Sequence, residues 1–176
     1  MLEWDRKLLP RERDIGAIGG SGQRVLAAAC IHDVVLRLGD SFAASLGPGL
    51  LTYLRNSLQA LRDREHCSTA ETLVKEGEAL LEREENLGVG EYDLIMAIVT
   101  SLDIGDSEPN PLKCLEAMSY AYQVVLNRRI LSSLDGEHTE MKVSVLERSD
   151  FVCIAAIERQ LNMLAMLQRG EAIHMG

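Results

Sequence analysis

Apolar residues recur along this sequence mostly at three- and four-residue intervals, the spacing of the buried face of an amphipathic α-helix. In the first third of the chain this pattern predicts a helix over residues 22–38, with Ser21 as its N-cap and Gly39 at its end. It also predicts a short helix over residues 41–46. A series of leucines beginning near Gly49 predicts the next helix.

Three further helices are predicted between residues 68 and 134. The sequence Ser68-x-x-Glu71 is a capping box ahead of an amphipathic segment. The apolar run 94–99 fits a buried strand or a central helix. We interpret it as a helix, because it contains Ala, Met and Leu and no partner strand is evident. The pair Asn110-Pro111 is a helix start signal.

The last part of the chain is predicted in less detail. The helix that starts after Asn110 is expected to end near Leu134, where Asp-Gly follows. Within residues 137–148, MKVSVLE alternates like a strand but would have nothing to pair with, so these residues are strand, loop or an extension of the last helix. That last helix is predicted over residues 149–169.

Together these elements predict an all-α fold, a single-domain bundle of six to seven helices over residues 20–170. Residues 1–19 are expected to form an N-terminal arm and flexible joint, with Trp4 docking the arm. Residues 171–176 are expected to form a fraying tail. The chain has 176 residues and few aromatics, which suits one core of aliphatic side chains packed between helices.

The negative charge of the chain is concentrated in its middle. Residues 63–108 contain thirteen Asp and Glu against three Lys and Arg, whereas the rest of the chain contains fourteen against fifteen. The net charge of −9 therefore belongs to one segment. A field of this sign repels polyanions, so it argues against binding of nucleic acid and favours a basic partner.

A protein-binding surface is accordingly predicted on the helix after Ser68 and on the residues that follow it. Glutamates late in this helix face the unfavourable end of the helix dipole, a conflict that functional surfaces often show. A neighbouring tyrosine could supply the apolar anchor that an interface needs. The predicted partner-binding residues are Glu71, Glu78, Glu82, Glu84, Glu85, Glu91, Tyr92 and Asp93.

No catalytic residue, metal ligand or cofactor is predicted. The glycine-rich GAIGGSGQR lacks the lysine of a phosphate-binding loop. The four histidines include no H-x-x-x-H pair. The four cysteines are far apart and are expected to be reduced and buried. No apolar run is long enough to span a membrane and no signal peptide is evident, so a cytoplasmic location is expected.

Three features together point to a known family: the acidic segment DREHCSTAETLVKEGEALLEREEN, the helical pattern over about residues 20–170 and the lack of a catalytic constellation. In these features the chain resembles small all-helical immunity proteins of bacterial polymorphic toxin systems. This resemblance implies tight inhibition of one cognate toxin, often a nuclease with a basic cleft. Two alternatives stay open. One is an enzyme or ligand sensor with an inter-helix pocket that uses His32, His66 or Asp93. The other is an adaptor that forms a homodimer through its last helix.

Overall fold

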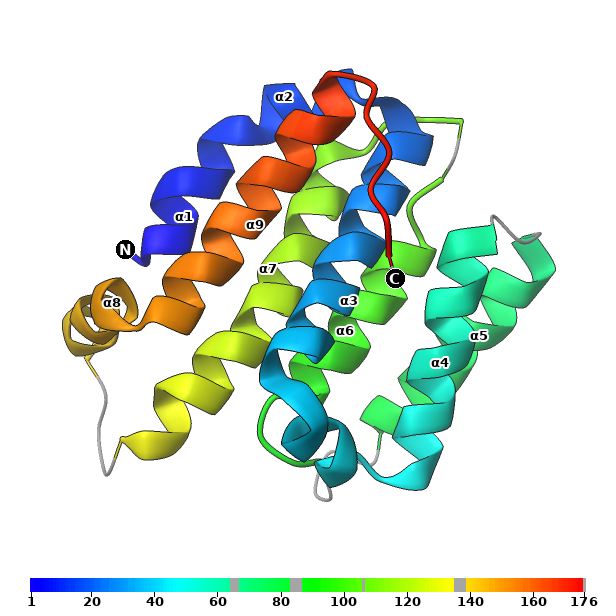
Figure 1. The fold of residues 1–176 in the computed structure, drawn as a ribbon. Helices are drawn as coiled ribbons and strands as arrows, with labels where there is room; N and C mark the ends of the chain where they lie inside the picture. Colours follow the sequence, from blue (N-terminus) through cyan, green and yellow to red (C-terminus); the bar gives the residue numbers. More distant parts are fainter. Residues whose placement is uncertain (64–66, 83–86, 106, 135–138, 176) are drawn as a thin grey trace.

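Helix α7 lies at the centre of the fold in the computed structural model (Figure 1). The structure describes residues 1–63, 67–82, 87–105, 107–134 and 139–175. Its α-helices and short 3₁₀ helices (η) are α1 (Glu3–Leu8), η1 (Leu9–Arg11), α2 (Glu12–Ala17), α3 (Gly19–Ser45), α4 (Pro48–Asp63), α5 (Cys67–Leu81), α6 (Glu91–Leu102), α7 (Pro111–Arg129), η3 (Leu131–Ser133), α8 (Glu140–Ser149) and α9 (Phe151–Gln168). The described residues form no strand, and the predicted all-α bundle is confirmed.

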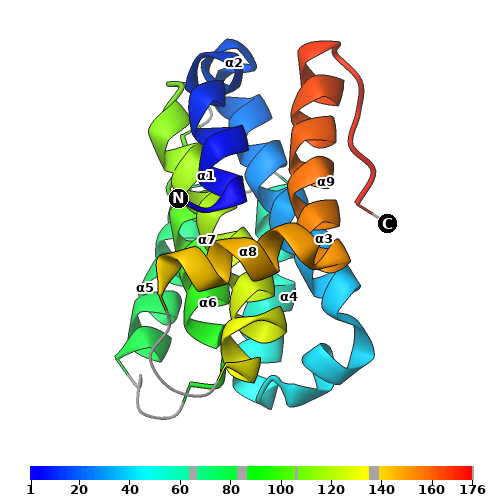
Figure 2. The ribbon, with the colours of Figure 1, turned by 90° about the vertical axis from the view of Figure 1, so that its left-hand side faces the viewer.

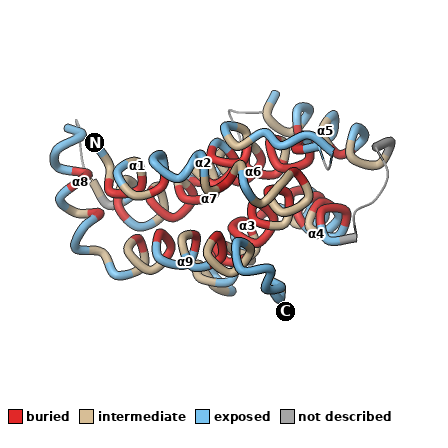
Figure 3. The backbone as a smooth tube through the Cα atoms, turned by 90° about the horizontal axis from the view of Figure 1, so that it is seen from above, coloured by how far each residue is buried: buried red, intermediate tan, exposed pale blue. Residues whose placement is uncertain are grey.

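The helices pack in two layers around α7. Seen from above, α1, α6 and α5 lie on one side, α9, α3 and α4 on the other, and α7 between them (Figure 3). Helices that follow one another in the sequence run in opposite directions from α3 to α7 (Figure 1). Fully buried aliphatic side chains such as Leu26, Ile95 and Ile98 fill the space between the layers. None of the described helices is long and apolar enough to cross a membrane.

Two local sequence signals are confirmed. Gly39 adopts φ 70°, a left-handed conformation that glycine tolerates without strain, and it kinks α3 at the predicted end of the first helix. Pro111 is the first residue of α7, and the side chain of Asn110 caps this helix by accepting a hydrogen bond from the Lys113 N–H at 3.1 Å.

The N-terminal arm is part of the core, contrary to the expectation of a flexible joint. Gly19 already begins α3, two residues before the predicted cap, so the glycine-rich stretch forms the first turn of a helix. Trp4, Leu8 and Ile15 are almost completely buried, which confirms that Trp4 docks the arm. Burial of these three large side chains outweighs the helix-breaking preference of the glycines.

The end of the chain also differs from the prediction. Helix α7 ends at Arg129 and a 3₁₀ turn follows, so the helix is shorter than expected. Residues 140–149 form a separate helix, α8, which crosses the bundle (Figure 2). Asp150 separates α8 from α9, because its carboxylate accepts hydrogen bonds from the N–H groups of Val152 and Cys153. The C-terminal tail then runs back along α3 (Figure 1).

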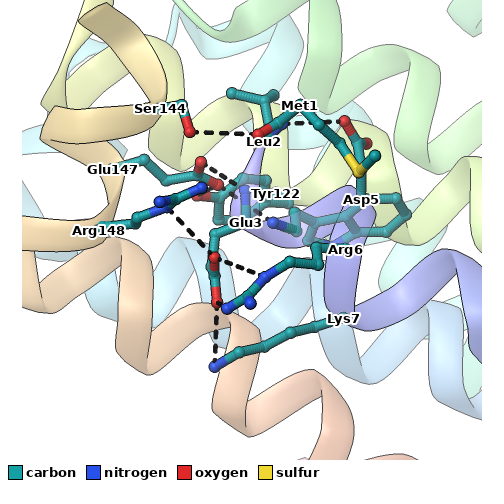
Figure 4. A network of polar contacts seen from close by, with 11 residues as sticks. Met1, Leu2, Glu3, Asp5, Arg6, Lys7, Tyr122, Ser144, Glu147 and Arg148 are labelled. Atoms are coloured by element: carbon teal, nitrogen blue, oxygen red, sulfur yellow. Dashed lines mark hydrogen bonds and ion pairs between the residues drawn. The ribbon is translucent and has the colours of Figure 1, made fainter. Parts of the chain in front are cut away.

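A buried carboxylate explains why α1 and α8 lie together. Glu147 is completely buried and accepts hydrogen bonds from the backbone N–H of Glu3 at 2.7 Å and of Trp4 at 3.2 Å (Figure 4). The Tyr122 hydroxyl donates a third hydrogen bond to it at 2.6 Å. The first N–H groups of a helix have no partners within the helix, so a carboxylate at that position satisfies them and complements the helix dipole.

Candidate functional site

The acidic helix α5 is held against α4 and α6 by its apolar side. Leu73 is buried, and Gly77 faces Tyr53 of α4 and Val99 of α6. A Cβ atom at Gly77 would lie 2.3 Å from the Tyr53 hydroxyl oxygen and 2.5 Å from a Val99 methyl carbon. Glycine is therefore required for this close approach. The opposite side of α5 is left open to solvent.

That open side carries the charge, and we call it the α5 acidic face. Its exposed residues include four glutamates and one lysine, namely Glu71, Glu76, Glu78, Glu82 and Lys75. Within the described residues, Glu76, Glu78 and Glu82 make no ion pair. Glu71, Glu78 and Glu82 are spaced by seven and four residues, so they form one stripe along the helix. The sequence prediction omitted Glu76, which the structure shows to be exposed.

The predicted residues after α5 are arranged differently. Glu91 is buried and accepts a hydrogen bond from the Gly88 N–H at 2.8 Å, so its carboxylate closes the turn before α6. Tyr92 is partly exposed at 38%. Glu84 and Glu85 lie outside the described residues. The structure therefore presents Glu71, Glu78, Glu82 and Tyr92 at the surface, and it turns Glu91 inward.

Asp93 lies at the junction of α6 and α7. It is partly buried and accepts a hydrogen bond from the side chain of Asn127. Burial raises the pKa of Asp93, and the hydrogen bond from Asn127 opposes that rise. Tyr120 lies nearby on α7. Its pKa is raised by burial and by the neighbouring Glu116, Tyr92 and Asp93. Tyr120 was not among the predicted site residues, and it extends the surface from Tyr92 onto α7.

Of the residues named for an inter-helix pocket, His32 and Asp93 lie at different places in the fold. His32 lines a cavity of about 260 Å³ between α3, α9 and the C-terminal tail, where it meets His174 and Met163. Asp93 belongs to the α6–α7 junction, and His66 lies outside the described residues. His174 was assigned to a fraying tail, but Ile173 and Met175 beside it pack against the core.

The structure also places three of the four cysteines. Cys30, Cys114 and Cys153 are free and buried, as predicted. Burial raises the pKa of Cys114 and of Cys153 to about 12. Among the described residues, no group of three His, Cys, Asp or Glu side chains is arranged to hold a metal ion. On α9, Met163 and Leu164 are buried in this chain's own core, while Phe151 is exposed.

Comparison of the chain with protein-family models, with curated proteins and with solved structures gave no match.

Proposed function

We propose that this chain is a protein-binding module whose α5 acidic face docks a basic protein. The observation that carries the proposal is the set of exposed glutamates on the outer side of α5, of which Glu76, Glu78 and Glu82 have no ion pair within the described part of the chain. Charges presented in this way on a rigid helix speed the encounter with an oppositely charged partner by electrostatic steering.

The position of these charges on the helix supports the proposal. Glu78 and Glu82 lie at the C-terminal end of α5, and the last turn of this helix has no basic residue. Glu82 is still joined to the helix, because its N–H donates to the Glu78 carbonyl at 3.0 Å. Carboxylates at a helix C-terminus oppose the dipole and cost stability of about 0.3–1 kcal/mol each. A role in binding accounts for residues that the helix itself does not favour.

The more specific form of the proposal is an immunity protein or antitoxin. A toxin that cleaves nucleic acid has a positively charged cleft, and a row of carboxylates at helical spacing complements such a cleft as a phosphate backbone does. Helix α5 carries such a row of carboxylates, and its close packing at Gly77 against α4 and α6 holds the helix in position. The resemblance of the acidic segment to bacterial immunity proteins points to the same partner class.

A charge reversal tests the proposal. The variant Glu71→Lys/Glu78→Lys/Glu82→Lys should lower the association rate constant for the partner by at least about tenfold at low salt. A control reversal at three other exposed glutamates, Glu12, Glu108 and Glu158, changes the net charge equally but leaves α5 intact. Equal slowing by both variants would mean that only net charge matters, and the α5 site would be rejected.

A second candidate function is the binding of a small molecule in the cavity at His32. The cavity between α3, α9 and the tail favours it, because two imidazoles and the thioether of Met163 line the same cavity. Screening of small ligands by thermal shift, with His32→Leu as the control, tests this reading. A ligand that stabilises the wild-type chain and the variant equally would count against it.

A further inference from the structure

A second surface feature lies beside the predicted site, on the side of α7 that faces α1. A groove of about 480 Å³ runs there, a volume within the range of about 300–1,000 Å³ that is common for binding sites. Trp4 and Leu115, both nearly buried, line it, and Leu9 and Leu112 border it with exposed fractions of 52% and 62%. Exposed leucines beside an apolar groove are a feature of interaction sites.

The groove follows one face of a single helix. The α7 residues that line it are spaced at three- and four-residue steps: Leu112, Leu115, Glu116, Ser119, Tyr120 and Gln123. From Leu112 to Gln123 the helix rises by about 16 Å. An occupant helix of about three turns would match this length, with apolar side chains at i, i+3, i+4 and i+7 entering the groove.

Acidic residues flank this apolar groove. Asp5 of α1 and Glu116 of α7 line it, and neither makes an ion pair within the described part of the chain. The groove continues toward the predicted site, because Tyr120 lies close enough to Tyr92 and Asp93 for both to raise its pKa. Asn127, one turn beyond Gln123 on α7, bonds to Asp93.

We propose that this groove binds an amphipathic, basic helix of the partner. The apolar face of that helix would lie on the exposed side chains of Leu9 and Leu112, and its basic residues would face Asp5 and Glu116. This inference rests on the proposed function for the identity of the partner, but it concerns a different surface. The α5 acidic face steers the partner electrostatically, and the groove supplies the desolvated apolar contacts that hold it.

A model peptide tests the groove directly. The probe is a 15-residue peptide of leucine and lysine alone, with leucines at helical i, i+3, i+4 and i+7 spacing. The control is a peptide of the same composition in scrambled order. Trp4 is the only tryptophan of the chain and lines the groove, so its fluorescence reports binding there and not on the rest of the acidic surface.

Two matched variants distinguish binding in the groove from non-specific binding to exposed leucines. Leu112→Glu places a charge at the groove border, and the change is compatible with folding because Leu112 is exposed and lies in the first turn of α7. Leu36→Glu makes the same change at a leucine of equal exposure on α3, which does not line the groove. Circular dichroism during urea unfolding checks that both variants are folded.

The expected result is a saturable change of Trp4 fluorescence with the amphipathic peptide. Leu112→Glu should weaken this binding at least about tenfold, and Leu36→Glu should leave it within about twofold. The groove is rejected if no saturable change occurs, if the scrambled peptide binds equally, or if both variants weaken binding alike.

The same variants separate failure of the groove from failure of the proposed function. If reversal of the α5 charges abolishes partner binding while Leu112→Glu leaves both peptide and partner binding unchanged, the groove inference fails and the α5 proposal stands. If the peptide requires Leu112 but partner binding is insensitive to the α5 charges, the proposed function fails and the groove is retained.

Discussion

The hydroxyl oxygen of Tyr53 lies 2.3 Å from the point that a Cβ atom at Gly77 would occupy. This contact fixes the distance between α4 and α5, and so it determines where the acidic face is presented. The hydroxyl groups of Tyr53 and Ser57 are both buried, and neither makes a well-oriented hydrogen bond within the described part of the chain. The helices are therefore packed tightly around Gly77, and the two buried hydroxyl groups beside it contribute little hydrogen bonding to stability.

Alanine at position 77 should lower the free energy of unfolding. Gly77→Ala forces α4 and α6 away from α5, and overpacking of this kind costs about 1–3 kcal/mol, which exceeds the gain in helix propensity. Urea unfolding followed by circular dichroism measures the loss. Tyr53→Phe removes the nearest atom of the clash, so it should recover part of that loss in the double variant. Alone it should be nearly neutral, because the hydroxyl makes no well-oriented hydrogen bond within the described part of the chain. A Gly77→Ala variant as stable as the wild type would show that the contact does not constrain the helix.

Removal of the buried carboxylate of Glu147 should release the N-terminal arm. Glu147→Ala leaves the N–H groups of Glu3 and Trp4 and the hydroxyl of Tyr122 without their acceptor. Such losses in a buried site cost about 3 kcal/mol. Glu140→Ala is the matched control, because Glu140 is exposed and pairs only with the N-terminal amine among the described residues. We expect the control to cost little, because an ion pair between exposed groups is screened by solvent. Urea unfolding monitored by Trp4 fluorescence separates the two, and equal costs would contradict the assigned role of Glu147.

The pKa of Asp93 predicts how stability changes with pH. Because burial raises this pKa above the unfolded value, the folded state binds the proton more tightly than the unfolded chain does. The contribution of Asp93 is therefore favourable below the unfolded pKa and is lost as pH rises through the folded pKa. Asp93→Asn keeps an acceptor for Asn127 and removes the charge, so it should raise stability at pH 7 relative to the wild type. Its advantage should shrink at pH 3. An advantage that is constant across this range would mean that the charge of Asp93 is not responsible.

The buried thiols should not react in the folded protein. Burial raises the pKa of Cys114 and Cys153 to about 12 and that of Cys30 well above its ordinary value, so the thiolate fraction at pH 8 is very small. In a Cys67→Ser variant, Ellman's reagent should detect no fast thiol until denaturant is added, and three thiols afterwards. A fast-reacting thiol in the folded variant would show that one of these three sites opens readily.

Local signals in the sequence were sufficient for much of the fold. The kink at Gly39 and the start of α7 at Asn110-Pro111 depend on backbone preferences and on a cap within a few residues. Such features can be recognised without knowing the rest of the structure. The outer side of α5 was also predictable, because the glutamates lie at helical spacing opposite the leucines.

Features that depend on distant residues could not be predicted in this way. The burial of the arm depends on Glu147, which lies 144 residues from Glu3. The position of helix α8 depends on the same contact between Glu147 and the N-terminal arm. The alternating pattern of its residues does not reveal this contact and so left its secondary structure ambiguous. The inward turn of Glu91 follows from the loop at Gly88, and the groove beside Leu112 exists only because α1 packs along α7.

The measurement that tests the central claim most directly is capture of a partner from a lysate of the source cells by three immobilised forms of the chain, at low and at high salt. The forms are the wild type, the reversed variant Glu71→Lys/Glu78→Lys/Glu82→Lys and the control reversed at Glu12, Glu108 and Glu158. The account predicts a basic protein that the wild type and the control retain at low salt, that high salt weakens and that the α5-reversed variant loses. Retention of the same protein by all three forms, or retention that salt does not affect, would contradict it.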